Sequence, residues 1–376
     1  MKTEEISIFD TLPPDDELRI KFSKVKTTDW CWRMEKDYPP ANGLKVFSCF
    51  AGGGGSTMGY KLAGCEVVGC CEIDKVMNAV YVKNHSPKHN YCMDLREFNK
   101  IPNCKLPKEL FSLDILDGSP PCTTFSLAGK REKTWGKKKK FREGQAEQTL
   151  DDLAFVFIET AMKLKPKCVI MENVEGLLAG NAIKYCKKIQ EDFRTAGYVV
   201  KHWVLKGEHM GVPQCRHRVF FIALRNDIVL DLDQIDMHFS CKEITYGEIK
   251  DGNCIQIRPG SICLSALQKA KRGEHDLADV YRRLGEKIRS FNDRIIWDNE
   301  MCCTITSHST LMSGDDKAKL SRMDIVHAQT FPEDYDFCGR SVQYICGMSV
   351  PPVMIKRIVG RLIKSGLFDE KKGALK

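Results

Sequence analysis

The 376-residue sequence predicts an α/β protein whose strands alternate with helices. Short apolar runs bounded by Gly, Pro or charged residues indicate buried strands. Residues 150–164, which precede the predicted strand 168–172, carry apolar side chains at helical spacing. Strands that alternate with helices form a sheet that binds ligands at the carboxyl ends of its strands. The predicted strands are 44–50, 66–72, 113–117, 168–172, 198–205 and 218–224.

The alternating pattern weakens after about residue 225 and returns weakly near the end of the chain. Residues 350–367 predict a helix entered through two prolines. The length is sufficient for two domains. We therefore expect a main α/β domain formed by residues 44–225 and 335–376, a small, irregular, β-rich domain at 226–334, and an N-terminal extension at 1–43.

Composition excludes several broad classes. The 43 % apolar and 29 % charged fractions are typical of a soluble globular protein, and no apolar run approaches the roughly 18–20 residues of a membrane helix. The start, MKTEEISIFD, lacks a signal-peptide pattern, so we expect a cytoplasmic protein. None of the 18 cysteines is three residues from another, which argues against CxxC metal clusters, and we expect no metal.

Positive charge is concentrated in one segment. Residues 130–143, KREKTWGKKKKFRE, contain eight Lys or Arg and two Glu. A cluster this dense, with Trp135 and Phe141 inside it, suits a polyanionic partner such as nucleic acid. The alternative is a solvated loop without a partner.

A glycine loop, FAGGGGSTMG, follows the first predicted strand. Gly52 and Gly54 begin a dinucleotide-type pattern, but Thr57 stands where its third glycine belongs. Glu72 ends the next strand, where an acid can bond ribose hydroxyls, and Asp94, at the expected end of a third strand, would suit an adenine amino group. These residues favour a site for an adenosyl-containing cofactor. A simple tight turn, and a surface or helix-capping Asp94, are the alternatives.

Cys122 follows two prolines at the end of a predicted strand, in the segment DGSPPCTTFS. Pro120 and Pro121 restrict the backbone in front of the thiol. A thiol held on a fixed path at the ligand edge of a sheet can act as a nucleophile. A buried structural cysteine is the alternative.

Two further segments carry polar groups suited to the same edge. Glu172 ends the predicted strand CVIME, and GVPQCRHRVFFIAL offers Gln214, Arg216 and Arg218. Alternate residues of an extended segment share a face, so the two arginines can act together on a carboxylate or a base carbonyl. A capping carboxylate and a surface ion pair are the alternatives.

The order of these motifs resembles the DNA (cytosine-5) methyltransferases of bacteria and phages. FAGGGG, PPC, ENV and QxRxR are followed by a variable stretch, then AQTFP at 328–332 and GMSVPP at 347–352. The resemblance covers residues 44–367. It implies a Rossmann-like methyltransferase sheet with a small target-recognition domain, and an enzyme that transfers a methyl group from S-adenosyl-L-methionine to C5 of cytosine in double-stranded DNA. The stretch 226–300 matches the target-recognition region, which the strand-like segments 243–249 and 302–308 flank.

The resemblance also implies roles for residues. Cys122 matches the nucleophile, Glu172 the carboxylate that contacts the base, and Arg216 and Arg218 the arginines that hold this carboxylate and the base carbonyl. The implied cofactor site consists of Phe50, Gly52, Gly54, Glu72, Ile73, Asp94, Pro120, Ser349 and Val350. The expected DNA contacts are Ser126, Lys130, Arg131, Lys137, Lys138, Lys139, Lys140, Arg142 and Gln214. We expect a monomer that flips the target base out of the duplex and that serves in restriction–modification.

Two positions depart from the family pattern: Thr123 stands where Gln is usual, and Met348 where Asn is usual. A tRNA-methylating relative, an amino-methyltransferase, an inactive DNA-binding relative and a nicotinamide oxidoreductase remain as alternatives. The first usually carries a CFT tripeptide and the second an aromatic residue after Pro-Pro, and both are missing here. An intact Cys122, Glu172 and Arg218 argue against the third, and PPC, ENV and QxRxR against the fourth.

Overall fold

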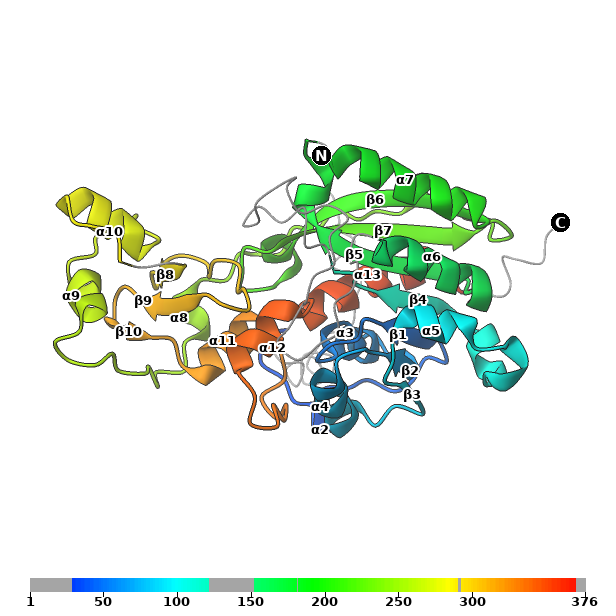
Figure 1. Ribbon diagram of the computed structural model, residues 1–376, viewed down its shortest axis with the longest axis horizontal. Coiled ribbons are helices and arrows are strands. Elements are labelled where there is room, and N and C mark those ends of the chain that lie inside the picture. Colours follow the sequence, from blue (N-terminus) through cyan, green and yellow to red (C-terminus); the bar gives the residue numbers. More distant parts are fainter. Residues whose placement is uncertain (1–28, 122–151, 181, 290–291, 370–376) are drawn as a thin grey trace, which may run out of the picture.

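The computed structural model describes residues 29–121, 152–180, 182–289 and 292–369. A seven-stranded sheet forms its larger part (Figure 1). The strands are β1 (Lys45–Cys49), β2 (Glu66–Cys71), β3 (His89–Tyr91), β4 (Ile115–Gly118), β5 (Cys168–Val174), β6 (Tyr198–Lys206) and β7 (His217–Arg225). The helices along this part are α2 (Met34–Asp37), α3 (Gly55–Leu62), α4 (Lys75–His85), α5 (Leu95–Lys100), α6 (Leu153–Leu164) and α7 (Ala182–Thr195), with short 3₁₀ turns η2 (Asn103–Lys105), η3 (Lys108–Phe111), η4 (Glu175–Leu178), η5 (Gly207–Met210) and η6 (Leu232–Gln234).

The strand order is β3-β2-β1-β4-β5-β7-β6. The first five strands are parallel, and β7 runs antiparallel to both β5 and β6. From β1 the chain builds outward through β2 and β3, then crosses to β4 on the opposite side. The carboxyl ends of β1 and β4 therefore flank a topological switch point, which is where open α/β sheets bind ligands.

Both faces of the sheet are covered, because successive strand residues point to opposite faces. Phe47 contributes to the core on one side, beneath α5, α6 and α7. Its neighbour Val46 contributes to the core on the other side, which also contains Tyr60 of α3 and Ile355 near the end of the chain. The predicted fold class, an α/β sheet with alternating helices, is thereby confirmed.

The element bounds match the predicted ones closely for most strands. The exception is the strand predicted to end at Asp94: the corresponding β3 is only three residues long and ends at Tyr91. Asp94 does not end this strand but caps the N-terminus of α5, its carboxylate accepting from the backbone N–H of Arg96 at 2.8 Å. The helix-capping alternative therefore describes Asp94 in this structure.

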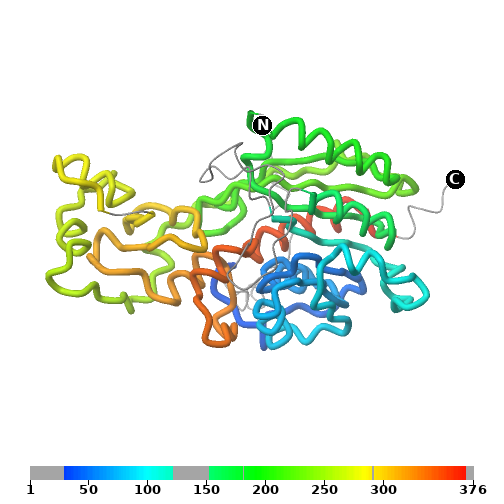
Figure 2. The backbone as a smooth tube through the Cα atoms, viewed as in Figure 1, coloured from blue at the N-terminus to red at the C-terminus, as the bar shows by residue number. Residues whose placement is uncertain are grey.

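A smaller lobe follows β7. It contains α8 (Tyr246–Ile249), α9 (Ile262–Gln268), α10 (Leu277–Leu284), β8 (Asp293–Ile296), β9 (Thr310–Ser313) and β10 (Ala318–Lys319). Its three strands form a separate sheet of order β10-β9-β8. Leu277, Tyr281, Trp297 and Met312 belong to its own buried core. Figure 2 shows this lobe extending to one side of the large sheet.

The expectation of strands at 243–249 and 302–308 is wrong. Residues Tyr246–Ile249 form helix α8, which begins at a capping box in which Thr245 and Glu248 exchange hydrogen bonds. The T-x-x-E spacing overrides the alternating apolar pattern because it satisfies the free N–H groups of a helix start. Residues 302–308 form no strand and make one isolated bridge, between Cys302 and Gln214.

The chain returns to the large sheet through α11 (Arg322–Ala328), α12 (Val342–Met348) and α13 (Pro352–Lys364). The last helix packs closely on α3: a Cβ added to Gly59 would lie 2.4 Å from the Pro352 carbonyl oxygen. Residues 29–43, part of the predicted extension, also join the fold. Trp32 is 3 % exposed and donates from its indole to the Thr330 carbonyl at 2.9 Å. None of the described helices has the length and apolar character needed to cross a membrane.

Candidate active site

The glycine loop turns sharply between β1 and α3. Phe50, Gly52 and Gly54 all have positive φ, at 54°, 51° and 81°. Gly54 is also crowded, because a Cβ placed there would lie 2.1 Å from Nε2 of the buried His85. Glycine is therefore required at residue 54 both for its backbone conformation and for the close approach of α4. This turn leaves the loop open on the side that faces the carboxyl end of β2.

Glu72 follows β2 and holds the loop from that side. It is 8 % exposed; one carboxylate oxygen accepts from the N–H of Gly52 at 2.8 Å and the other from the N–H of Asp74 at 2.7 Å. Burial raises its pKa, and the two backbone hydrogen bonds counter the shift. Each oxygen keeps a further lone pair for a ligand hydroxyl.

A pocket lies beside this loop at the carboxyl ends of β1, β2, β3 and β4. Among the predicted cofactor residues, its lining includes Phe50, Gly52, Glu72, Ile73 and Asp94. Gly54, Pro120, Ser349 and Val350 are not among the lining residues. The last two pack behind the glycine loop, where a Cβ on Gly55 would lie 2.3 Å from the Val350 carbonyl oxygen.

Sequence reasoning missed much of the apolar lining. Met77, Met93, Leu153 and Tyr344 line the pocket, and so does Met348, which the sequence marked only as a departure from the family pattern. No short motif marks the other four, which come from α4, the loop after β3, α6 and α12.

A buried acid lies next to the start of α3. Asp117 of β4 is 3 % exposed and accepts hydrogen bonds from Ser48 at 2.7 Å, Ser56 at 2.6 Å and Tyr60 at 3.1 Å. Burial raises its pKa to about 6, and these hydrogen bonds oppose the rise. Asp117 thus ties β1 and the start of α3, which directly follows the glycine loop, to β4.

Glu172 and Arg218 form an ion pair at the carboxyl end of β5. The Arg218 Nε lies 2.9 Å from a Glu172 carboxylate oxygen, and the two side chains are 15 % and 13 % exposed. In the antiparallel register Val174 lies opposite Arg218, so Glu172 is its diagonal neighbour on the same face. Burial lowers the pKa of Arg218, and the Glu172 carboxylate opposes that shift.

Arg216 and Gln214 lie deeper than this pair. Arg216 is 3 % exposed and donates to the backbone carbonyls of Ile305 at 3.1 Å and Gly347 at 3.3 Å, while its Nε has no partner. Gln214 is fully buried. Its side-chain N–H groups donate to the Ala328 carbonyl and to the Gln329 Oε1, and its Oε1 accepts from the Ile305 N–H. The geometry places Gln214 inside the joint between the lobes, with no exposed atom for DNA.

The segment that leads to the predicted thiol is tied to β5. The Asn173 side chain donates to the Pro120 carbonyl at 3.4 Å, and Pro121 lines the pocket. Cys122 itself lies outside the described residues, as does Thr123. The predicted DNA contacts Ser126, Lys130, Arg131, Lys137, Lys138, Lys139, Lys140 and Arg142 also lie outside them.

These features define a class of protein, an α/β enzyme with a ligand pocket at the switch point of an open sheet and a buried acid–arginine pair at the same edge. The family model for C-5 cytosine-specific DNA methylases matches residues 44–364. The chain therefore belongs to the C-5 cytosine-specific DNA methylase family, and it is a DNA methyltransferase.

Individual relatives agree with this assignment. The type II methyltransferase M.FnuDI of Fusobacterium nucleatum is 30 % identical over 355 residues, covering 88 % of this chain and 96 % of that protein. M.Sau96I of Staphylococcus aureus is 27 % identical over 351 residues, covering 88 % and 76 %. A prophage-encoded putative DNA modification methyltransferase of E. coli has the same fold, with a TM-score of 0.63, 18 % identity, and coverage of 87 % of this chain and all of that one.

Proposed function

We propose that this enzyme transfers a methyl group from S-adenosyl-L-methionine to C5 of cytosine in a short, specific sequence of double-stranded DNA. One observation carries the proposal: the pocket, the Glu172–Arg218 pair and Pro121, the residue before Cys122, all lie at one edge of the sheet. A methyl donor, a nucleophile and an acid must act on one base, so they need to converge in this way.

The residues that line the pocket fit the cofactor. Glu72 offers two carboxylate oxygens with spare lone pairs, which suit ribose hydroxyls. Phe50, Ile73 and Met93 provide apolar surface for an adenine ring, and Asp94 lies among them. When bound, S-adenosyl-L-methionine supplies an electrophilic methyl group on its sulfonium. We assign Gly54, Ser349 and Val350 the role of holding the glycine loop in shape behind the pocket.

The remaining groups suit the activation of cytosine. The Cys122 thiolate adds to C6 while N3 gains a proton, and C5 becomes a carbon nucleophile able to accept the methyl group. Loss of the C5 proton, expulsion of the thiolate and release of the proton gained at N3 then restore the aromatic ring. We assign Glu172 the contact with N3, and Arg218, which pairs with Glu172 at 2.9 Å, the role of orienting it. We assign Arg216 a positioning role, because its guanidinium joins two backbone carbonyls.

The target atoms are inaccessible in a duplex, so the base must be flipped out. We propose that the basic segment 130–143 contacts phosphates, which suits its charge. The smaller lobe, within residues 226–334, is the candidate for sequence recognition. Because the two relatives described above are named as type II methyltransferases, we also propose that this enzyme serves as the modification partner of a restriction system.

The test is Cys122→Ala, with Cys104→Ala as the matched control because Cys104 is an exposed, free cysteine on η2. Expressed in a methylation-free bacterium, the wild type and the control should produce 5-methylcytosine at one short motif. Cys122→Ala should produce none and should fail to form a covalent complex with 5-fluorocytosine DNA, while still binding the cofactor. Methylation by Cys122→Ala would refute the mechanism. A wild type that binds DNA but never methylates it would favour the inactive relative, and one that modifies only tRNA would favour the tRNA enzyme.

A further inference from the structure

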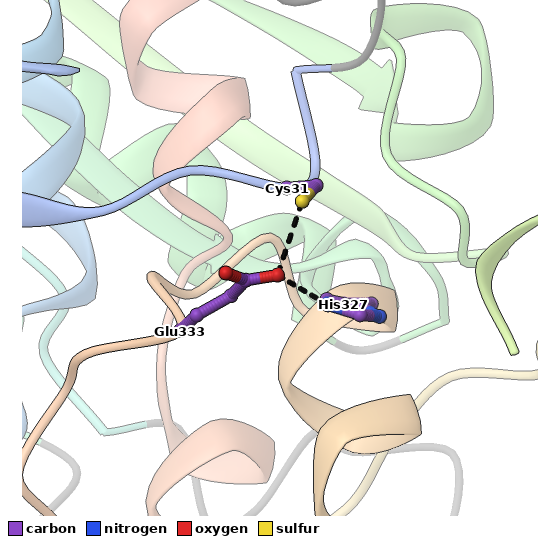
Figure 3. Close-up of side chains that lie close together, drawn as sticks. All are labelled: Cys31, His327 and Glu333. Atoms are coloured by element: carbon purple, nitrogen blue, oxygen red, sulfur yellow. Dashed lines mark hydrogen bonds and ion pairs between the residues drawn. The ribbon is translucent and has the colours of Figure 1, made fainter. Parts of the chain in front are cut away.

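Three metal-ligating side chains of different kinds meet outside the active site. The Cys31 sulfur, the His327 ring and the Glu333 carboxylate offer ligand atoms that all lie within 4.8 Å of one another (Figure 3). The Cys31 Sγ lies 3.1 Å from the Glu333 Oε1, and the His327 Nε2 lies 3.3 Å from the same oxygen. Cys31 comes from the segment before β1, His327 from α11 and Glu333 from the loop after α11.

The His327 ring is oriented as in metal sites. Its Nδ1 lies 2.9 Å from the Ile249 carbonyl oxygen, which can only accept, so Nδ1 carries the hydrogen. Metal-ligating histidines commonly donate their other ring N–H in this manner, which fixes the tautomer and aims the bare nitrogen at the ion. The edge-on ring of Trp30, 4.8 Å away between centroids, also packs against the imidazole.

The three groups converge on one carboxylate oxygen. The Glu333 Oε1 lies 3.1 Å from the Cys31 sulfur and 3.3 Å from the His327 Nε2. With the hydrogen on Nδ1, Nε2 keeps a lone pair on the side that faces this oxygen. A divalent cation can take sulfur, imidazole nitrogen and carboxylate oxygen as ligands together.

We propose that Cys31, His327 and Glu333 bind a zinc ion. Zinc accepts sulfur, nitrogen and oxygen ligands together, in tetrahedral geometry. Its usual bond lengths place tetrahedral nitrogen and oxygen ligands about 3.4 Å apart, and sulfur and oxygen ligands about 3.6 Å apart. The separations of 3.3 Å and 3.1 Å are close to these values, and the Cys31 sulfur and the His327 Nε2 lie within 4.8 Å of each other, so those two side chains would need to approach each other to share one ion. Three protein ligands leave one position for water.

The zinc ion would link two segments of the fold that are far apart in the sequence. The three ligands span residues 31 to 333, and the same two segments already exchange a hydrogen bond from the Glu333 N–H to the Trp32 carbonyl at 2.9 Å. Two residues further on, the Tyr335 hydroxyl donates to the Gly53 carbonyl at 2.5 Å, in the glycine loop. A metal that holds residues 327–333 in place would therefore also stabilise the glycine loop through this contact with Tyr335.

The experiment is a metal titration of the full chain, stripped with EDTA and kept reduced with a thiol-free reductant. Cobalt(II) is titrated first, because thiolate ligation gives it a charge-transfer band, and zinc then competes against a chelating dye. The variants are Cys31→Ser, which keeps a hydroxyl donor toward Glu333, and Glu333→Gln. The control is Cys241→Ser, at another half-buried cysteine.

We expect the wild type and Cys241→Ser to bind one metal per chain with a thiolate band. Cys31→Ser should lose the band. Both cluster variants should bind zinc at least about 10- to 100-fold more weakly, because that is the loss of affinity that follows when a residue merely hydrogen-bonded to a metal ligand is removed. Circular dichroism checks that each variant is folded, and Glu333→Gln gives a second test if Cys31→Ser is not. A wild type without a stoichiometric thiolate band, or a band that persists in Cys31→Ser, would overturn the proposal. Neither readout depends on methylation.

Discussion

The Glu172–Arg218 pair allows a quantitative test of how the site is built. Replacing Arg218 by Met keeps most of the side-chain volume but removes the cation 2.9 Å from Glu172. Breaking a buried ion pair from one side costs about 3–5 kcal/mol, because the remaining charge is left desolvated. Both side chains retain some solvent exposure, at 15 % and 13 %, so we expect the lower end, about 3 kcal/mol.

The double-mutant cycle isolates the pair itself. Glu172→Gln keeps a hydrogen-bond acceptor and should cost about 1.5 kcal/mol. The double variant should cost less than the sum of the single variants, with a coupling energy of about 2 kcal/mol. Urea unfolding followed by tryptophan fluorescence, at constant pH near neutrality, measures all four free energies of unfolding.

The control cycle uses an exposed pair, Lys201 with Asp233, whose side chains are 37 % and 78 % exposed at a separation of 2.6 Å. Lys201→Met and Asp233→Asn should couple by no more than about 0.2–1 kcal/mol. A coupling below about 0.5 kcal/mol for Glu172 and Arg218 would refute the argument that Arg218 holds the Glu172 carboxylate in place.

Three further predictions concern the buried residues Glu72, Trp32 and Asp117. Glu72→Gln replaces an oxygen that accepts from the N–H of Gly52 or Asp74 with an amide that donates. The affinity for S-adenosyl-L-methionine, measured by calorimetry, should therefore fall by about 1.5–3 kcal/mol, or roughly 10- to 150-fold. An unchanged affinity would contradict this. Trp32→Ala should lower the free energy of unfolding by about 3–5 kcal/mol, since the indole is 3 % exposed, and a loss below about 1 kcal/mol would show that residues 29–43 are peripheral. Burial raises the pKa of Asp117 from 3.8 to about 6, so its contribution to stability is greatest below about pH 4 and is lost as the pH rises through 6. Asp117→Asn should flatten this part of the pH dependence of urea unfolding, and an unchanged slope would place its origin elsewhere.

Most strands of the large sheet, β3 excepted, are accurately predicted from sequence because a buried strand needs a continuous apolar run. The run CVIME, for example, begins where β5 begins, at Cys168. Residues 243–249 mislead for the opposite reason. Their alternating pattern suits a strand, but the capping box of Thr245 and Glu248 forms a helix start within four residues. A pattern over a few residues is overridden when local hydrogen bonds favour another conformation.

The QxRxR motif illustrates the same limit within the site. Sequence spacing groups Gln214, Arg216 and Arg218 and predicts that both arginines hold Glu172, but spacing carries no information about depth, and Arg216 instead donates to the carbonyls of Ile305 and Gly347. In the structure Arg218 faces Glu172, whereas Gln214 is fully buried against Gln329 and the backbone of the smaller lobe. Burial depends on what packs against a segment, here residues more than 80 positions away along the chain.

By itself, the sequence determined the family, the α/β class and the glycine loop with its acid, because these depend on ordered motifs and on apolar runs that act locally. Only the tertiary structure decided which lining residues complete the pocket, how deep Gln214 lies, and that Cys31, His327 and Glu333 meet. Cys31 lies 302 residues before Glu333 along the chain, whereas His327 and Glu333 are only six residues apart. Such contacts are set by how helices and loops pack in three dimensions, and no spacing rule along a chain encodes that packing.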